Sequence, residues 1–170
     1  PISPYSLAKT ACTHFLQMLH RTENFPVVIL RLFLTYGPGQ DSKRFIPQII
    51  RGCLKEETFS TSTGEQLRDF CYVEDTARAI LQALTISNVE GEVFNISSGE
   101  CILIRTVIEN ICTLTNAGRP QYGKIFYRPK ENMALYADIS KANKLLQWKP
   151  IISLVEGLKK TINYYENDYA

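Results

Sequence analysis

Two features that would direct a protein to a membrane or a nucleic acid are missing from this chain of 170 residues. It has no uninterrupted apolar run near the roughly 20 residues that a membrane-spanning helix needs. Its formal net charge of +2 is too small to favour nucleic acid or an anionic membrane surface as a partner. With 45% hydrophobic residues, the composition instead fits a globular domain with a sizeable core.

The chain also lacks paired cysteines. Its five cysteines are odd in number and contain no Cys-x-x-Cys pair: Cys12, Cys53, Cys71, Cys101 and Cys112. This pattern predicts reduced thiols that are buried or partly buried, and it therefore predicts a cytoplasmic protein. The two histidines, His14 and His20, share no metal-ligand spacing on their predicted helix, so we expect no metal site.

A glycine-rich phosphate-binding turn is missing as well. The nine glycines form neither Gly-x-Gly-x-x-Gly nor Gly-x-x-Gly-x-x-Gly. In dinucleotide-binding folds such a turn follows the first strand and lets a pyrophosphate approach a helix N-terminus. The sequence therefore contains no complete dinucleotide-binding motif.

The N-terminal segment does contain a Tyr-x-x-x-Lys pair, Tyr5 and Lys9, at the start of a predicted helix. Residues four apart share one helix face, so the spacing holds the Lys9 ammonium near the Tyr5 phenol. A cation stabilises the phenolate, which is the form that takes up a proton in general acid–base catalysis. The same pair also arises by chance, as an amphipathic tyrosine beside a solvated lysine. The segments downstream decide between the two interpretations.

Predicted strands and helices alternate along the chain. Ser3 and Pro4 suit a helix start, and this helix should run to about Arg21. Residues 27–33 are an apolar, β-branched run typical of a buried parallel strand. Further helices are predicted over residues 45–54, 74–84, 104–114, 140–146 and 153–165, and extended segments over 58–60, 67–73, 92–96 and 124–127. This alternation indicates an α/β fold.

Helical spacing predicts which faces of two helices are buried. In the first helix the apolar stripe comprises Ala8, Cys12, Phe15, Leu16 and Leu19. In the helix over residues 74–84 the inward face should comprise Ala77, Ile80, Leu81 and Leu84. Asp69 and Asp75, close to the start of that second helix, are expected to serve structure rather than catalysis.

Several blocks of sequence occur in the order and spacing of a known family. They are Ser3–Lys9, Arg31–Pro38, Gly64–Asp75, Arg128–Pro129, Ala137–Ala142 and Leu145–Pro150. In these blocks the chain resembles the extended short-chain dehydrogenase/reductase family, specifically its NAD(P)-dependent nucleotide-sugar epimerases and dehydratases. The resemblance covers nearly the whole chain. It implies the C-terminal portion of a Rossmann-type doubly wound fold plus a small α/β substrate-binding domain.

The resemblance also implies a domain division and partners. Residues 1–40 would be the remnant of the NAD(P)-binding Rossmann domain, comprising the catalytic helix and the following strand. Residues 41–170 would mainly bind the nucleotide sugar, with some segments returning to the Rossmann sheet. Together with the missing glycine-rich turn, this predicts the C-terminal half of a longer protein. The expected cofactor is NAD or NADP, the substrate a nucleotide-diphosphate sugar, and the assembly a homodimer.

In the family, the tyrosine matching Tyr5 is the catalytic acid/base beside the nicotinamide. The lysine matching Lys9 bonds the nicotinamide ribose, and a third catalytic residue, a serine or threonine, lies upstream of Tyr5. The implied reaction oxidises or reduces a sugar hydroxyl, usually at C4. Two alternatives stay open: a nucleotide-sugar 4-reductase of dideoxysugar synthesis, and a non-catalytic binding or scaffold protein that retains the fold.

The resemblance assigns substrate contacts to Arg44, Phe59, Arg68, Arg128 and Glu131. The three arginines match positions that contact the diphosphate, and arginine meets phosphate with planar pairs of donors. Glu131 matches an acidic residue that binds the nucleotide ribose, and Phe59, with its neighbour Thr61, falls near the base. Leu34 stands where the family commonly has an asparagine. It therefore receives no binding role, and a simple UDP-galactose epimerase or dTDP-glucose dehydratase assignment is not implied.

Overall fold

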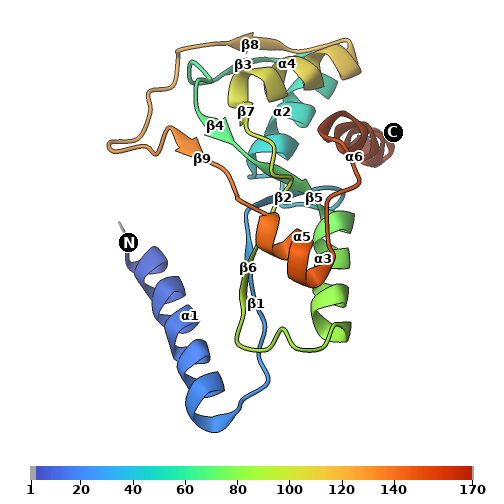
Figure 1. The fold of residues 1–170 in the computed structure, drawn as a ribbon. Coiled ribbons are helices and arrows are strands. Elements are labelled where there is room, and N and C mark those ends of the chain that lie inside the picture. The colour runs from blue at the N-terminus through green and yellow to red at the C-terminus, as the bar shows by residue number, and fades with distance from the viewer. Residues whose placement is uncertain (1–2, 170) are drawn as a thin grey trace.

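The computed structural model describes residues 3–169 as helices interleaved with short strands (Figure 1). The helices are α1 (Pro4–Glu23), α2 (Phe45–Leu54), α3 (Val73–Thr85), α4 (Ile104–Thr115), α5 (Ser140–Leu146) and α6 (Leu154–Tyr169). The strands are β1 (Ile29–Leu32), β2 (Leu34–Tyr36), β3 (Thr58–Ser60), β4 (Leu67–Arg68), β5 (Phe70–Tyr72), β6 (Val93–Ile96), β7 (Ile102–Leu103), β8 (Arg119–Gln121) and β9 (Ala134–Leu135). This alternation confirms the α/β fold class.

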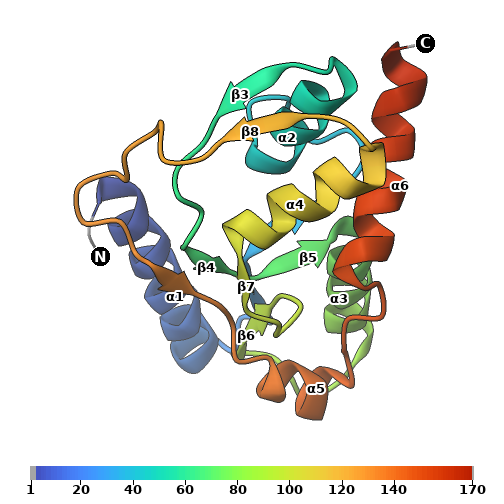
Figure 2. The ribbon, with the colours of Figure 1, turned by 90° about the horizontal axis from the view of Figure 1, so that it is seen from above.

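Helix α1 begins where the sequence predicts. The Ser6 backbone N–H donates to the Ser3 hydroxyl (3.1 Å), and the Ser3 backbone N–H donates to the Ser6 hydroxyl (3.0 Å), which together cap the first turn. Figures 1 and 2 place α1 and α3 on opposite sides of the β1–β6 pair. Within the described chain α1 buries only Thr13. The predicted apolar stripe is therefore left largely uncovered, with Phe15 56% exposed.

The strand predicted over residues 27–33 continues into a second pairing. Strand β1 pairs in parallel with β6, and β2 pairs in parallel with β5. Between the two strands, the Phe33 N–H donates to the Ile96 carbonyl (3.1 Å), which is the last contact with β6. The chain thus changes partner at Phe33. This change carries β2 toward a second group of elements.

Two hydrophobic clusters form the core. The first lies among β2, β5, α2, α4 and α6 and comprises Tyr36, Ile46, Ile49, Ile50, Cys53, Phe70, Tyr72, Val107, Ile108, Ile111, Leu158, Ile162 and Tyr165. The second lies among β5, β6, α3 and α5 and comprises Cys71, Ala79, Val89, Phe94, Ile96, Ala142, Leu146 and Trp148. Strand β5 contributes side chains to both clusters because its successive side chains point to opposite faces. Residues on both sides of position 40 pack in each cluster or against it. The division of the chain into two domains at that position stays a prediction.

Two further small sheets lie beside the first cluster. Strand β3 pairs in parallel with β8, while β4 lies between β7, to which it is antiparallel, and β9, to which it is parallel. The strand predicted over residues 67–73 is interrupted at Asp69, between β4 and β5. The Asp69 side chain is fully buried and accepts hydrogen bonds from the Ser98 N–H (2.8 Å), the Gly99 N–H (3.0 Å) and the Ala137 N–H (3.2 Å). One carboxylate thereby joins three chain segments.

A second buried carboxylate, Asp75, ties α3 to the C-terminal part of the chain. It accepts hydrogen bonds from the Arg78 guanidinium and from the Ile151 (3.2 Å) and Ile152 (3.0 Å) backbone N–H groups. The Trp148 indole N–H donates to the Asp75 carbonyl (3.0 Å). These contacts agree with the structural role expected for Asp75.

The inward face predicted for α3 is wrong. Ile80, Leu81 and Leu84 are 43%, 62% and 78% exposed, whereas Asp75, Thr76 and Ala79 are the buried residues of the helix. The helix is rotated in this way because Asp75 must face inward to meet the N–H groups that follow Trp148. Ala79 lies one turn later on the same side and packs in the second cluster.

Two other predictions also need correction. The extended segment expected at residues 124–127 is irregular, and the strand lies earlier, at β8, because a turn at residues 122–123 with Gly123 at φ 76° ends it. The thiols are all free, but Cys12 and Cys101 are exposed rather than buried, because the stripe of α1 is uncovered and Cys101 precedes β7 at the surface.

Between residues 3 and 169, no helix combines the length and hydropathy of a membrane span. The same residues contain no metal-binding group of three or more His, Cys, Asp or Glu side chains.

Candidate functional site

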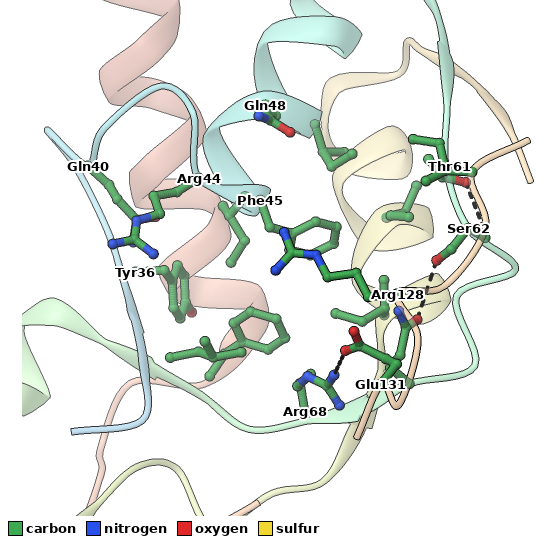
Figure 3. Close-up of a pocket in the computed structure, with 18 of the residues that line it drawn as sticks. Tyr36, Gln40, Arg44, Phe45, Gln48, Thr61, Ser62, Arg68, Arg128 and Glu131 are labelled. Atoms are coloured by element: carbon green, nitrogen blue, oxygen red, sulfur yellow. Dashed lines mark hydrogen bonds and ion pairs between the residues drawn. The ribbon is translucent and has the colours of Figure 1, made fainter. Parts of the chain in front are cut away.

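A cleft with a volume of about 900 Å³ opens beside the first hydrophobic cluster (Figure 3). Its lining comes from three parts of the chain: residues 32–49 at β2 and the start of α2, residues 60–70 between β3 and β5, and residues 125–131 between β8 and β9. Ile104 and Ile108 of α4 close the back. A cleft of this size accommodates a ligand of several hundred daltons.

Two arginines enter the cleft from different walls. Arg44 is the N-cap residue of α2, and Arg128 precedes a turn that is closed by the hydrogen bond from the Glu131 N–H to the Arg128 carbonyl (3.0 Å). In Figure 3, Arg128 reaches across the cleft toward Phe45, while Arg44 lies on the other side, near Tyr36. Within the described residues neither guanidinium donates a hydrogen bond or forms an ion pair. Two uncompensated cations near a helix N-terminus favour an anionic ligand.

The third predicted arginine is already paired. Arg68 Nη2 donates to Glu131 Oε1 (2.6 Å), and Arg68 Nη1 donates to the Leu67 carbonyl (2.8 Å). The two charged side chains are only 12% and 24% exposed. This ion pair joins β4 to the segment before β9 and fixes one wall of the cleft.

Aromatic side chains form the floor. Tyr36 packs edge-on against Phe70, with ring centroids 6.2 Å apart, and Phe45 stacks on Phe70 at 6.0 Å. The Tyr36 hydroxyl donates to the Leu154 carbonyl (3.2 Å), and burial raises the pKa of Tyr36 well above its usual value. Tyr36 therefore stays protonated and supports the floor. Gly157 permits this contact, since a Cβ there would lie 2.2 Å from the Tyr36 hydroxyl oxygen.

The wall beyond β3 is lined by small hydroxyl and amide groups. Thr61 is buried, and its backbone carbonyl accepts from the Ile125 N–H (3.0 Å), which holds the 125–131 segment against this wall. The Ser62 hydroxyl donates to Gln66 Oε1 (3.4 Å). Sequence reasoning missed Ser62 and Gln66, although the polar run before Gly64 was a signal. Phe59, by contrast, packs against the first cluster over Gly52 and is not among the lining residues.

Tyr5 and Lys9 lie together on α1 but outside the cleft lining. Lys9 Nζ lies 5.7 Å from the centroid of the Tyr5 ring, so the helix brings the two groups together as the spacing predicts. Tyr5 is 72% exposed, and Lys9 is exposed as well. The structure therefore presents the pair on an open helix face. It does not place the pair among the residues that surround the cleft.

The residues present fit one end of a nicotinamide dinucleotide. An ammonium and a phenol on one open face match the donors that a ribose diol and a reacting hydroxyl require. The pyrophosphate at the centre of the cofactor has no counterpart, because the sequence contains no glycine-rich turn. The fit is thus limited to the nicotinamide ribose.

A family profile described as the NAD dependent epimerase/dehydratase family matches residues 1–97. The chain belongs to this family. The profile covers α1, the cleft segments up to β5, and the β1–β6 pair, so it includes Tyr5, Lys9, Arg44 and Arg68.

Similar proteins agree with this membership. The chain is 32% identical over 178 residues to dTDP-glucose 4,6-dehydratase from Haemophilus influenzae and 31% identical over 177 residues to that from Neisseria gonorrhoeae. Each alignment covers 97% of this chain but 52% and 51% of the relative. The chain therefore spans about half the length of the curated relatives it matches.

Solved structures match over the whole fold. A UDP-glucose 4-epimerase from Thermotoga maritima, with UDP-glucose, gives a TM-score of 0.92 at 30% identity and covers 100% of this chain and 55% of that one. A UDP-glucuronic acid 4-epimerase from Bacillus cereus, in complex with UDP-glucuronic acid and NAD, gives 0.90 at 32% identity and covers 99% of this chain and 54% of that one. The fold is therefore that of the C-terminal portion of a Rossmann-type epimerase or dehydratase.

Proposed function

We propose that the whole protein is an NAD(P)-dependent epimerase or dehydratase that acts on a nucleotide-diphosphate sugar. The observation that carries this proposal is the cleft: Arg44 and Arg128 bring into it two guanidinium groups that form no ion pair among the described residues, over an aromatic floor. A diphosphate needs such paired guanidinium donors, and a sugar ring packs well on aromatic and aliphatic surfaces. Membership of the epimerase/dehydratase family supports the same substrate class.

In this proposal Tyr5 is the catalytic acid/base, and Lys9 orients the nicotinamide ribose beside it. As phenolate, Tyr5 takes the proton of a sugar hydroxyl, usually at C4, and in the reverse direction it returns that proton. Lys9 stabilises the phenolate and donates hydrogen bonds to a ribose diol. A bound nicotinamide would supply hydride transfer. NAD and NADP are both compatible with the residues of this chain.

The later steps distinguish the activities within the family. Return of hydride to the opposite face of the keto-sugar gives an epimer, while loss of water before reduction gives a deoxy-keto sugar. A 4-reductase would start from the keto-sugar, with Tyr5 as proton donor. Leu34, which is 40% exposed at the cleft, offers no polar contact to a substrate.

We also propose a cytoplasmic homodimer in which α1 forms part of the interface. Its uncovered side chains include Leu7, Phe15 and Met18, which are 59%, 56% and 42% exposed. A helix with this much exposed apolar surface is stabilised when a second helix packs on it.

Assay of the whole protein with NAD or NADP against UDP-, dTDP- and CDP-linked hexoses tests the proposal. We expect turnover of at least one of these sugars, followed by product analysis that separates epimer, deoxy-keto sugar and reduced sugar. Binding of nucleoside diphosphates without turnover would support the scaffold alternative. Failure to bind any of the three nucleoside diphosphates would refute the proposed substrate class.

A further inference from the structure

The segment between β8 and β9, which carries Arg128, has one side chain that turns inward. Residues 122–133 form no helix or strand, so the place of Arg128 depends on the contacts of its neighbours. Between residues 123 and 130, Tyr127 is the one residue that is not exposed, and it lines the cleft. Phe126 beside it is 91% exposed. Tyr127 is therefore the side chain that can anchor this part of the segment.

The Tyr127 hydroxyl belongs to a closed ring of three hydrogen bonds. It accepts from the Glu65 backbone N–H (3.1 Å) and bonds the Thr63 hydroxyl. The Thr63 hydroxyl in turn donates to Glu65 Oε2 (3.3 Å). A backbone N–H only donates and a carboxylate only accepts, so the Tyr127 hydroxyl must donate to Thr63. In this ring, called the Tyr127 network below, both hydroxyl protons are used.

The chain on the other side of the network is bound to helix α4. The Arg105 backbone N–H donates to the Gly64 carbonyl (2.9 Å), and Arg105 Nε donates to the Thr63 carbonyl (3.1 Å). A Cβ at Gly64 would lie 2.8 Å from the Arg105 backbone nitrogen, so only a glycine permits this close approach. Because α4 packs in the first hydrophobic cluster, Tyr127 is attached through this chain to the core.

We propose that Tyr127 is a positioning residue for Arg128: its hydroxyl holds the next residue of the chain at the cleft before a ligand binds. This inference rests on the proposed function and concerns the affinity of the same site. The Arg128 side chain, which reaches across the cleft in Figure 3, forms no ion pair or hydrogen bond of its own within the described residues. Its position is therefore set by its backbone, and the Tyr127 network holds that backbone.

Pre-organisation is the physical reason why the network affects binding. A segment that is already ordered loses little conformational entropy when a ligand binds, whereas a loose segment loses that entropy on binding and weakens the affinity. Removal of the Tyr127 hydroxyl keeps the ring and removes only the network. The loss of an uncharged hydrogen bond corresponds to about a fivefold change in an equilibrium constant.

The test is calorimetric titration of the whole protein with UDP, dTDP or CDP. Tyr127→Phe should bind about fivefold more weakly than wild type. Thr63 does not line the cleft, so Thr63→Val should weaken binding only through the network, and Thr63→Ser, which keeps the hydroxyl, should bind like wild type. The double variant Tyr127→Phe with Arg128→Met should bind no more weakly than Arg128→Met alone, because Tyr127 acts through Arg128.

Tyr122→Phe is the matched control. Tyr122 lies just before the segment, does not line the cleft, and has a buried hydroxyl without a hydrogen-bond partner in the described chain, so its loss should leave the Kd unchanged.

Three results would overturn the positioning role while the proposed function stands. They are a wild-type Kd for Tyr127→Phe, an equal further loss when Tyr127→Phe is added to Arg128→Met, and a Thr63→Ser variant that binds as weakly as Thr63→Val. If wild type binds none of the three nucleoside diphosphates, the proposed function and the positioning role fail together, so the two kinds of failure are distinguishable.

Discussion

Replacement of Arg128 by methionine tests the cationic cleft most directly. Arg128 lines the cleft and has no ion-pair partner within the described chain, so its removal deletes a cation without leaving a buried charge behind. Methionine keeps much of the length and apolar surface of the arginine stem. The change therefore isolates the guanidinium.

The expected loss follows from the surroundings of Arg128. A hydrogen bond that involves a charged group contributes about 1.5–3 kcal/mol. Arg128 is exposed, so solvent screening keeps the loss toward the lower part of that range, at about 2 kcal/mol or roughly thirtyfold in Kd. Part of this difference in binding free energy should disappear as salt is added, because exposed charges are screened within about 10 Å at 0.1 M.

The assay is calorimetric titration of wild type and Arg128→Met with a nucleoside diphosphate at two salt concentrations. Arg119→Met is the matched control, because Arg119 is exposed on β8 and does not line the cleft. The double variant Arg44→Met with Arg128→Met should lose less than the sum of the single losses if both residues bind one diphosphate. A Kd for Arg128→Met within twofold of wild type, at both salt concentrations, would refute the cationic cleft.

Three further predictions concern catalysis and stability. Tyr5→Phe should retain the fold and lose about 10²–10⁴-fold in kcat, the usual contribution of general acid–base catalysis, measured in the turnover assay of the whole protein; near-wild-type kcat would remove Tyr5 from the mechanism. Asp69→Ala should lower the free energy of unfolding by about 3–5 kcal/mol, measured with denaturant, because it leaves the N–H groups of Ser98, Gly99 and Ala137, in two segments, without their acceptor; a loss below 1 kcal/mol would contradict the joining role. Gly157→Ala should destabilise the protein by about 1–3 kcal/mol through overlap with Tyr36, and the double variant Gly157→Ala with Tyr36→Phe should recover part of that loss; equal destabilisation in both variants would place the strain elsewhere.

Local features of the sequence determined the ends of several elements. Ser3 and Pro4 predict the start of α1, and α2 and α5 occupy the residues that were predicted for them. These predictions succeed because capping and helical periodicity depend on residues within one or two turns. The Tyr5 and Lys9 contact succeeds for the same reason, since an i to i+4 spacing is internal to one helix.

Only the tertiary structure decided how distant segments meet. The rotation of α3 depends on Asp75 meeting N–H groups 76 and 77 residues away, and no periodicity in the helix encodes that requirement. Likewise, Arg68 and Glu131 are 63 residues apart, and only the pairing of β4 with β9 brings them together. The family resemblance assigned all three arginines to the diphosphate, whereas the fold pairs Arg68 with Glu131 and gives the other two no ion-pair partner within residues 3–169. Whether an arginine in the cleft is neutralised depends on which side chains lie next to it, and the packing of the whole chain decides that.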